Sequence, residues 1–500
     1  MNLSARRGRI ALPSLAAGVL LALSLPPWGW WPLGLAGAGL LYWRLAGLGW
    51  RTRVWSGWLA GLGCYGPGLM WARTFNWYGA LVLVLLEALF IAAAATLTPA
   101  QQGRAPAFVA AGTLAEALRM TWPFGGLPLG GVFLGQADGP LLDLARLGGP
   151  LLLTAGVWWG GVGLATAVAG WRRRPAPTGP GRGVVLLIAL ALLVVVGALA
   201  PDGGAPVRSI SVAAVQGGGR RGVDKEQVDP TTVFNAQLGA TFGISQRHAR
   251  PDLVLWPEDV LSLSGPLAGS SEATVMSRLA RQLHTTLVAG VTEPASRTTF
   301  RNEIVVWGPG GRLVAEFEKV HRVPFGEYIP FRSLLSHLAD LSQVPTDAVP
   351  GHGTGLLRTA AGPLGTLVSF EVFYAGRSRE SVRAGAELLI VPTNTSSYAS
   401  AQVPTQEVAA DAVQAVETGR SLVQAAPTGY STVVDQRGQV LQRSVLGRRQ
   451  VLTATVALRR GFTFYDHLGD LPFLLLAALA LATGWGRSRR TRPRSPAPSS

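Results

Sequence analysis

The order of apolar and polar positions divides the chain into two kinds of sequence. Up to about residue 200, and again near residue 475, long apolar runs alternate with short polar connections. A transmembrane helix needs about 17–25 mostly apolar residues, and these runs come close to that length. We therefore expect a membrane-embedded α-helical bundle of about eight spans, the last of them short. The predicted spans are 9–27, 31–48, 54–72, 79–98, 105–121, 148–170, 183–200 and 470–485.

The stretch from about Ser209 to Gly461 has a different pattern, in which short β-rich runs alternate with polar segments of helical character. This alternation is typical of an α/β domain. The expected strands include 210–215, 253–255, 286–291, 303–307, 364–370, 388–391 and 431–434. The resulting division is a transmembrane bundle over 1–205, an α/β domain over 206–465, a final transmembrane helix over 466–486 and a basic, Pro/Ser-rich tail over 487–500.

Composition and charge favour a membrane protein over a nucleic-acid-binding one. The chain is 48% hydrophobic and 14% charged, with a formal net charge of +16. Its arginines form short clusters between the apolar runs and at both ends, which is typical of cytoplasmic segments. Counting about eight spans puts all these clusters on one side and the α/β domain outside the cytoplasm. The clusters are Arg6–Arg9, Arg51–Arg53, Arg104, Arg172–Arg182 and Arg487–Arg494.

A few residues of the apolar region attract attention for their chemistry. Glu87 and Glu116 fall in predicted spans, where charged residues are rare and often functional. Since neither has an obvious partner in the sequence, we favour a structural or interfacial role for both. Cys64, the single cysteine, lies in an apolar run and is expected to be a small buried residue. The Gly- and Pro-rich segment 121–139 is expected to lie against the outer face of the membrane, where it could line a lipid entrance.

One stretch of the α/β region, Glu318 to Pro330, combines an isolated lysine with a rigid loop. Lysine occurs in this chain only at positions 225 and 319, although Lys and Arg together number 44. A buried lysine can share or lose its proton whereas arginine stays protonated, so the two are not interchangeable in chemistry. Two prolines and a glycine follow Lys319 and predict an irregular loop, which contains Glu327.

Two further candidate positions stand at the ends of predicted strands. The run 253–255 is followed by Trp-Pro-Glu, which places Glu258 at the mouth of a sheet. The strand 364–370 ends in Ser369-Phe370, and Glu371 follows. Functional groups of α/β proteins are commonly found at such strand ends. The histidines are scattered without metal-ligand spacing, so we expect no metal site.

Together these motifs resemble the carbon–nitrogen hydrolase (nitrilase) superfamily. The matching features are Trp-Pro-Glu, then Lys-x-x-x-Val-Pro-Phe-Gly-Glu-Tyr-x-Pro, then a strand that ends in an aromatic residue and Glu. Within the superfamily, the order of spans, domain and final span is similar to the apolipoprotein N-acyltransferase family. The resemblance implies a nitrilase-like four-layer α-β-β-α sandwich. It also implies that Glu258 is the general base, that Lys319 stabilises the tetrahedral intermediate, and that Glu327 and Glu371 support the site.

The same resemblance implies a reaction and its partners. A fatty acyl chain would pass from a phospholipid donor to an acyl-enzyme, and then to the N-terminal S-diacylglyceryl-cysteine of an apolipoprotein acceptor. No metal or organic cofactor and no nucleic acid is implied. The expected location is a bacterial inner membrane, with the nitrilase-like domain extracytoplasmic.

The sequence departs from the family pattern at the nucleophile. The family's Cys-Tyr-Glu is here Ser369-Phe370-Glu371, and Cys64 lies in a predicted span. An alcohol needs a base in its transition state, whereas a thiol is already partly ionised near neutral pH. Ser369 is the candidate nucleophile, with Glu258 and Lys319 available to assist it.

Other departures surround the expected pocket and leave alternatives open. The segments 394–399 and 424–429 differ from the family's motifs, and Arg322 stands where leucine is usual, whereas Glu417, Arg420, Asp435 and Gly438 fit. One alternative is a catalytically degenerate protein that binds lipid or lipoprotein without turnover. Another is a related acyltransferase or amidase with a different acceptor.

Overall fold

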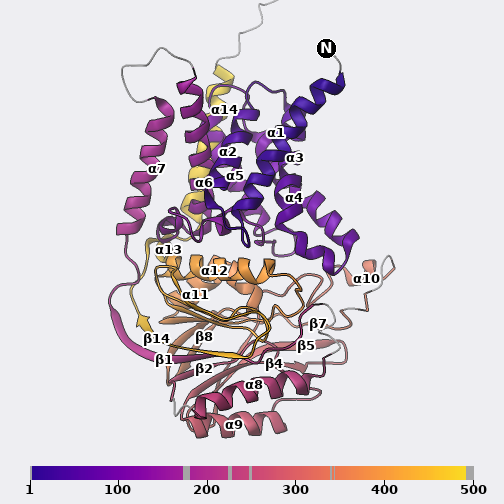
Figure 1. The fold of residues 1–500 in the computed structure, drawn as a ribbon, viewed down its shortest axis with the longest axis vertical. Coiled ribbons are helices and arrows are strands. Elements are labelled where there is room, and N and C mark those ends of the chain that lie inside the picture. The colour runs from indigo at the N-terminus through magenta and orange to yellow at the C-terminus, as the bar shows by residue number, and fades with distance from the viewer. Residues whose placement is uncertain are drawn as a thin grey trace, which may run out of the picture. The chain divides into compact units, whose positions relative to one another are not determined.

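The computed structural model describes residues 3–172, 181–222, 228–246, 250–337, 341–342 and 344–490. Arg173, Arg174 and Lys225, with the end of the basic tail from position 491, lie outside the described residues. The chain forms two compact units, one from Met1–Leu199 with Leu468–Ser500 and the other from Ala200–His467 (Figure 1). We call them the helical unit and the sandwich unit.

The helical unit has a helix at each predicted span. The helices are α1 (Leu3–Ser24), α2 (Trp31–Arg44), α3 (Trp50–Gly68), α4 (Trp77–Leu97), α5 (Arg104–Arg119), α6 (Ala145–Trp171), α7 (Arg182–Leu199) and α14 (Leu471–Arg490). Short 3₁₀ turns lie at η1 (Met70–Thr74), η2 (Val132–Gln136) and η3 (Leu142–Leu144).

Four stretches of the described helices are long and apolar enough to cross a membrane. They are Trp77–Leu97, Leu142–Trp171, Arg182–Leu199 and Leu471–Arg489. By contrast, α2 and α5 have 14 and 16 residues, which is less than the roughly 20 that a bilayer core requires. The structure thus has apolar helices of spanning length, and the count of eight spans stays a prediction.

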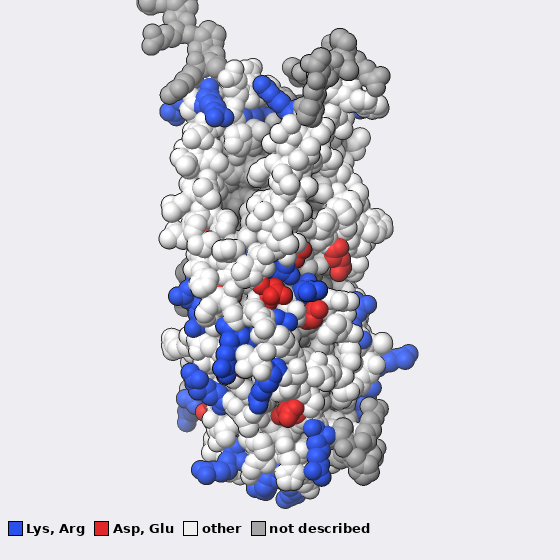
Figure 2. Space-filling view, turned by 90° about the vertical axis from the view of Figure 1, so that its left-hand side faces the viewer, with Lys and Arg blue, Asp and Glu red and all other residues white. Residues whose placement is uncertain are grey.

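Small residues allow the helices of this unit to approach closely. A Cβ added at Gly57 or Gly61 of α3 would lie 2.6 Å from the Ala95 side chain or 2.5 Å from the Ala88 backbone of α4. Two small residues one helical turn apart are typical of helix contacts in membranes. On the face drawn in Figure 2, this unit presents a broad surface with few charged residues. The helices of this unit are therefore closely packed, and the face drawn in Figure 2 is largely uncharged.

The sandwich unit contains two sheets. The first has the strand order β14-β1-β2-β4-β5-β6, with β3 paired to β4 and β7 to β5, and the second has the order β13-β12-β11-β10-β9-β8. The first sheet comprises β1 (Pro206–Gln216), β2 (Leu253–Leu255), β3 (Leu261–Ser262), β4 (Thr286–Pro294), β5 (Thr299–Trp307), β6 (Leu313–Glu318), β7 (Asp347–Ala348) and β14 (Gln450–Arg459). The second comprises β8 (Leu356–Thr359), β9 (Gly362–Thr366), β10 (Leu388–Pro392), β11 (Leu422–Ala425), β12 (Thr432–Val434) and β13 (Val440–Arg443).

Alternating side chains of the strands build two cores. On β2, Leu253 and Leu255 belong to a core shared with Leu364 and Ile390 of the second sheet, whereas Val254 packs on the opposite side. The outer side of the first sheet is covered by α8 (Pro230–Gln246) and α9 (Ser271–Leu283), and α11 (Ala375–Arg383) and α12 (Gln402–Thr418) cover the second sheet (Figure 1). The order helix–sheet–sheet–helix is the nitrilase-like α/β architecture expected from the resemblance. The remaining helices are α10 (Arg332–Leu335) and α13 (Phe464–Leu468).

One predicted strand is shorter than expected, and the difference concerns Ser369. The expected strand 364–370 ends in the structure at Thr366, where β9 ends. Ser369 instead begins a 3₁₀ turn, η5 (Ser369–Phe373), and its φ is +50°. A residue with a side chain rarely adopts this left-handed conformation. Here the conformation accompanies a sharp turn, at which the backbone leaves the sheet.

Candidate active site

Glu258 is held at the carboxyl end of β2 by the neighbouring strand. The amide of Trp256 donates to Val288 O at 2.8 Å, and the amide of Gly290 donates to Pro257 O at 2.9 Å. A Cβ at Gly290 would lie 2.4 Å from Glu258 Cα, so glycine is required at this close approach. The Glu258 side chain is 6% exposed. β2 and β4 together therefore fix a buried carboxylate at the sheet end.

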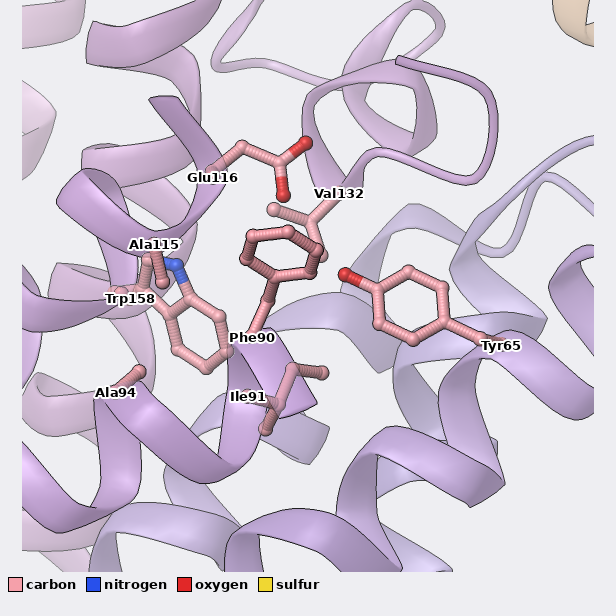
Figure 3. A pocket seen from close by; sticks show the side chains of 9 residues that line it. Tyr65, Phe90, Ile91, Ala94, Ala115, Glu116, Val132 and Trp158 are labelled. Carbon is pink, nitrogen blue, oxygen red and sulfur yellow. The ribbon is translucent and has the colours of Figure 1, made fainter. Parts of the chain in front are cut away.

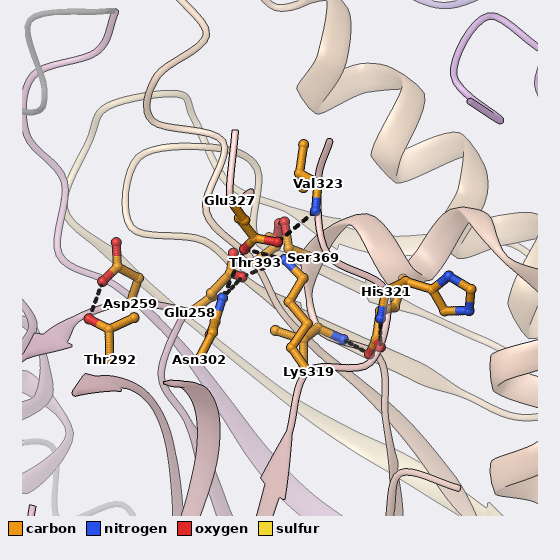
Figure 4. A network of polar contacts seen from close by, with 12 residues as sticks. Glu258, Asp259, Thr292, Asn302, Lys319, His321, Val323, Glu327, Ser369 and Thr393 are labelled. Carbon is orange, nitrogen blue, oxygen red and sulfur yellow. Dashed lines mark hydrogen bonds and ion pairs between the residues drawn. The ribbon is translucent and has the colours of Figure 1, made fainter. Parts of the chain in front are cut away.

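Lys319 lies just after β6 and joins two carboxylates. Its Nζ donates to Glu258 Oε1 and to Glu327 Oε1, each at 2.8 Å. Asn302 of β5 donates its Nδ2 to the same two oxygens, at 2.9 and 3.0 Å (Figure 4). The structure thus brings Glu258, Lys319 and Glu327 together, and it adds Asn302, which sequence reasoning missed.

The charge state of Lys319 follows from this arrangement. Burial alone lowers the pKa of Lys319, but the adjacent carboxylates of Glu258 and Glu327 outweigh burial, so the pKa is raised. Burial raises the pKa of Glu327, and Lys319 opposes that shift. Lys319 is therefore a fixed cation near neutral pH and can offer hydrogen bonds to negative charge.

The loop after Lys319 is ordered by its own backbone contacts. Glu327 Oε2 accepts a hydrogen bond from the Val323 amide at 2.7 Å, and the Ala348 amide donates to Glu327 O at 2.7 Å. Arg322 donates to Ala348 O at 2.8 Å and stacks over the Tyr328 ring, with the guanidinium carbon 4.1 Å from the ring centroid. These contacts explain how an irregular loop presents Glu327 to Lys319 in one orientation.

Glu371 supports the site through the backbone. Its carboxylate is fully buried and accepts hydrogen bonds from the amides of Val320, His321 and Val368, each at 2.9 Å. Burial raises the pKa of Glu371, and nearby Arg377 and the amide donors oppose that shift. Glu371 therefore ties the turn that carries Ser369 to the segment that follows Lys319.

Ser369, drawn with the cluster in Figure 4, has a strained backbone conformation. Its residue is 9% exposed, and its left-handed φ is the kind of strain that is concentrated at functional sites. Thr393 Oγ1, which follows β10, lies 3.1 Å from Ser369 Oγ. Thr393 is also within hydrogen-bond distance of Glu407 on α12. Thr393 and Glu407 were not foreseen from sequence, because the spacing of the motifs gives no sign of them.

The segments that depart from the family pattern meet one another in the structure. Arg221 donates to Thr428 O at 2.6 Å and to Tyr398 O at 2.7 Å, and Thr428 Oγ1 donates to Ser396 Oγ at 2.7 Å. The segments 394–399 and 424–429 therefore form one patch that Arg221 holds together.

The residues that fit the family pattern further along the chain have structural contacts. Glu417 accepts a hydrogen bond from Ser378 Oγ at 3.0 Å, and Arg420 donates to Gly461 O at 2.7 Å. Asp435 accepts from the amides of Arg437 and Gln439, each at 2.9 Å, in the turn between β12 and β13. These residues stabilise the sandwich and its connections.

A second buried charge cluster lies in the helical unit. Arg119 at the end of α5 pairs with Glu87 at 3.2 Å and with Glu116 at 2.7 Å. It also donates to the carbonyls of Leu127, Pro128 and Leu129 in the Gly- and Pro-rich segment. Glu87 and Glu116, for which we expected a structural or interfacial role, thus have a cationic partner in Arg119. The i,i+3 spacing of Glu116 and Arg119 was the signal in the sequence.

A small cavity adjoins this cluster (Figure 3). Its lining is apolar except for Glu116, the Tyr65 hydroxyl and the indole nitrogen of Trp158, and it has about 10 Å³ of space, enough for roughly one water molecule. Cys64 is fully buried in α3 of the helical unit, whereas Ser369 belongs to the sandwich unit. Among the residues that the structure describes, no group of histidine, cysteine and carboxylate side chains could hold a metal ion.

Comparison with known proteins covers nearly the whole chain. The family described as apolipoprotein N-acyltransferase N-terminal domain matches residues 17–163, and the carbon-nitrogen hydrolase family matches residues 212–461. The apolipoprotein N-acyltransferase of Azotobacter vinelandii is 31% identical over 97% of this chain and 96% of its own length. That of Mycolicibacterium smegmatis is 30% identical over 94% and 83%. That of Geobacter metallireducens is 32% identical over 66% of this chain and 64% of its own length.

Proposed function

This chain belongs to the apolipoprotein N-acyltransferase family of carbon–nitrogen hydrolases, and we propose that it acylates lipoproteins through an ester formed on Ser369. The chain is therefore an acyltransferase of this superfamily. The family matches cover parts of both the helical unit and the sandwich unit. The acyl donor in this proposal is a phospholipid, and the acceptor is the amino group of an N-terminal S-diacylglyceryl-cysteine. The observation that carries it is the strained Ser369 beside the Glu258–Lys319 pair (Figure 4).

In the first half-reaction, Ser369 attacks the ester carbonyl of the phospholipid. Glu258 accepts the Ser369 hydroxyl proton as the bond from Oγ to the acyl carbon forms. Negative charge then develops on the carbonyl oxygen, and Lys319 stabilises it. The bond between the acyl carbon and the phospholipid oxygen breaks, and Glu258 returns its proton to that oxygen. The products are a lysophospholipid and an acyl ester of Ser369.

In the second half-reaction, the acceptor amine attacks the ester. A bond forms from the amine nitrogen to the acyl carbon, and the bond to Ser369 Oγ breaks. Glu258 takes a proton from the nitrogen and passes a proton to Oγ, which restores the serine. Glu327 and Asn302 hold Lys319 and Glu258 in position during both steps, and Glu371 holds the turn that carries Ser369 through the Val368 amide. These steps balance without a metal or an organic cofactor.

The proposed location is a bacterial inner membrane, with the domain 206–465 extracytoplasmic. The arginine clusters between the apolar helices support this orientation, because such clusters remain in the cytoplasm. The four helices of spanning length support attachment to a membrane. A reporter fused near Gly311 that reads as cytoplasmic would contradict the orientation.

The test is acylation of Ser369 and its variants. Purified full-length protein is incubated with phospholipid, and the adduct is located by mass spectrometry. An oxygen ester on Ser369 should resist neutral hydroxylamine far better than a thioester. Ser369→Ala should lose both the adduct and acyl transfer, whereas Ser369→Cys should form a thioester that hydroxylamine removes.

The same pair of variants separates the proposal from a degenerate site. If wild type and Ser369→Ala are equally inactive while Ser369→Cys is active, the native protein is an inactive enzyme on an intact scaffold. A Ser369→Ala variant as active as an active wild type would show that another residue is the nucleophile.

A further inference from the structure

Ser369 belongs to a buried chain of polar groups that leads away from Glu258 and Lys319. Thr393 Oγ1 lies 3.1 Å from Ser369 Oγ, and on its other side it contacts Glu407 Oε1 within hydrogen-bond distance. Thr393 and Glu407 are 0% and 1% exposed. Ser369 comes from η5, Thr393 directly follows β10, and Glu407 comes from α12, so three separate parts of the fold build this hydrogen-bonded chain.

The protons available to this chain allow two arrangements. Thr393 has a single hydroxyl proton, so it cannot donate to Ser369 and to Glu407 at once. If Glu407 is ionised, Thr393 donates to the carboxylate and Ser369 must donate to Thr393, which directs its proton away from Glu258. If Glu407 is neutral, the carboxyl donates to Thr393, Thr393 donates to Ser369 Oγ, and the serine proton remains free to reach Glu258.

Resting on Ser369 as the proposed nucleophile, we propose that neutral Glu407 orients Thr393 to donate a hydrogen bond to Ser369 Oγ, which stabilises the negative charge that develops there as Glu258 removes the proton. Thr393 is then a catalytic residue because it touches the reacting oxygen. Glu407 is a positioning residue that acts through Thr393. The chain also acts in the second half-reaction, when Ser369 Oγ leaves the acyl carbon.

The surroundings of Glu407 favour its neutral form. Burial raises the pKa of Glu407 to about 8; the hydrogen bond with Thr393, and the charges of Lys319 and Arg221, oppose the shift, while Glu258 adds to it. Glu407 Oε2 has no hydrogen-bond partner among the described residues, which would be costly for an ionised carboxylate.

The next turn of α12 adds a second buried acid. Asp411 accepts a hydrogen bond from Thr432 Oγ1 at 2.8 Å, and burial followed by the charge of Glu407 raises the pKa of Asp411 well above its usual range. Two acids four residues apart on one helix cannot both ionise cheaply in a buried site. The buried α12 therefore carries two acids, and the raised pKa of Asp411 favours its neutral form beside Glu407.

The hydrogen-bonded chain from Glu407 through Thr393 compensates for the weak acidity of the Ser369 hydroxyl. A thiol has a pKa of about 8.5 and ionises in part near neutral pH, whereas an alcohol does not. An additional donor at Ser369 Oγ lowers the cost of removing its proton, because a hydrogen bond to a developing charge is stronger than one to a neutral group. The same donor matters much less to a sulfur nucleophile.

The first experiment compares Thr393→Val, which removes the donor, with Thr393→Ser, which keeps it. The readout is the single-turnover rate of Ser369 acylation by phospholipid in full-length protein. Thr393→Val should lose about 10- to 100-fold, the range of one hydrogen bond to a charged group, and Thr393→Ser should recover most of the rate. In the Ser369→Cys background, Thr393→Val should cost only a few-fold, which also shows that the variant site is folded.

The second experiment follows the pH profile of acylation. The neutral form of Glu407 is present below about pH 8, so the wild-type rate should fall as pH rises through that value. Because the pKa of Lys319 is raised, Lys319 stays protonated throughout this pH range and does not contribute to the fall. Glu407→Gln retains a donor that cannot ionise, so it should keep acylation within about tenfold and lose the alkaline fall. Glu407→Leu has no donor and should resemble Thr393→Val.

Each outcome has a separate meaning. A Thr393→Val rate equal to wild type, or an alkaline fall that persists in Glu407→Gln, would overturn the chain while leaving Ser369 as nucleophile. An equal loss from Thr393→Val in the serine and cysteine backgrounds would make Thr393 structural. If wild type forms no adduct on Ser369, the proposed nucleophile fails and the chain fails with it.

Discussion

The helical unit and the sandwich unit each bury one cation between two glutamates, and only one of these clusters has the surroundings of a reactive site. In the helical unit Arg119 lies between Glu87 and Glu116, with side-chain exposures of 0%, 6% and 6%. In the sandwich unit Lys319 lies between Glu258 and Glu327, with exposures of 2%, 6% and 15%. The formal charges are the same in both clusters.

The two cations differ in what they do with their donors. The guanidinium of Arg119 serves both carboxylates and three consecutive backbone carbonyls, from Leu127 to Leu129. Such a fork holds a loop in place. The ammonium of Lys319 is a compact charge, and Figure 4 draws Ser369, with its strained backbone, beside it. A buried cation–dicarboxylate cluster therefore indicates chemistry only where a reactive atom accompanies it.

The largest effect is expected from removing the cation of the helical unit. Arg119→Met leaves Glu87 and Glu116 buried without their counter-ion, which should lower the free energy of unfolding by about 3–5 kcal/mol. The measurement is thermal unfolding of the detergent-purified protein. Arg51→Met, at an exposed arginine on α3, is the matched control and should change little. An unaltered midpoint for Arg119→Met would remove the structural role given to this cluster.

The next effect comes from exchanging the cation types. Lys319→Arg keeps the charge, but its planar fork cannot occupy the point of the ammonium between Glu258 and Glu327. Loss of one donor to an oxyanion typically costs about 100- to 1,000-fold in rate, and we expect acyl transfer to fall by that amount. Arg312→Lys, at an exposed position before β6, is the control.

The reciprocal exchange should act on stability alone. Arg119→Lys cannot reach all the carbonyls of the loop, so it should lower the unfolding midpoint while the folded fraction keeps its acylation rate. Near-normal transfer by Lys319→Arg, or a lost rate without lost stability in Arg119→Lys, would break the contrast between the two clusters.

Sequence reasoning succeeded where the information is local. Apolar runs located the helices, and alternation of β-rich and polar segments indicated the α/β fold. The Lys-x-x-x-Val-Pro-Phe-Gly-Glu-Tyr motif singled out Lys319 and Glu327, which are close in sequence and joined at 2.8 Å in space. Their proposed roles still await the experiments above.

Sequence reasoning failed where contacts join distant elements. Asn302 has no motif of its own and becomes part of the site only because β5 pairs with β6, with the Lys319 amide donating to Asn302 O at 2.9 Å. Thr393 meets Ser369 only after β10 pairs with β9 in the second sheet, and Glu407 meets Thr393 only after α12 covers that sheet. The sharp turn at Ser369 was also missed. It depends on the buried carboxylate of Glu371, which accepts hydrogen bonds from the Val368 amide before the turn and from the Val320 amide of a distant segment.

The smallest effect is expected where a cation–carboxylate pair is exposed. Arg332 binds Asp347 through two contacts, at 2.5 and 3.1 Å, but the side chains are 32% and 31% exposed. Water and salt screen such a pair, so Arg332→Gln should lower the free energy of unfolding by at most about 1 kcal/mol at pH 7. Arg358→Gln, at an exposed arginine on β8, is the matched control.

The pH dependence of this pair has a definite sign. The hydrogen bond from Arg332 is the main cause that lowers the pKa of Asp347, against a smaller opposing effect of burial. The stabilisation is therefore present above the unfolded-state pKa of about 3.9 and is lost as pH falls through the lower folded-state pKa. Chemical unfolding at several pH values should show wild type and Arg332→Gln converging in acid and, at pH 7, in high salt. A difference that persists in molar salt would mean that this pair is shielded as the two buried clusters are, and exposure would then not explain the ranking of the three sites.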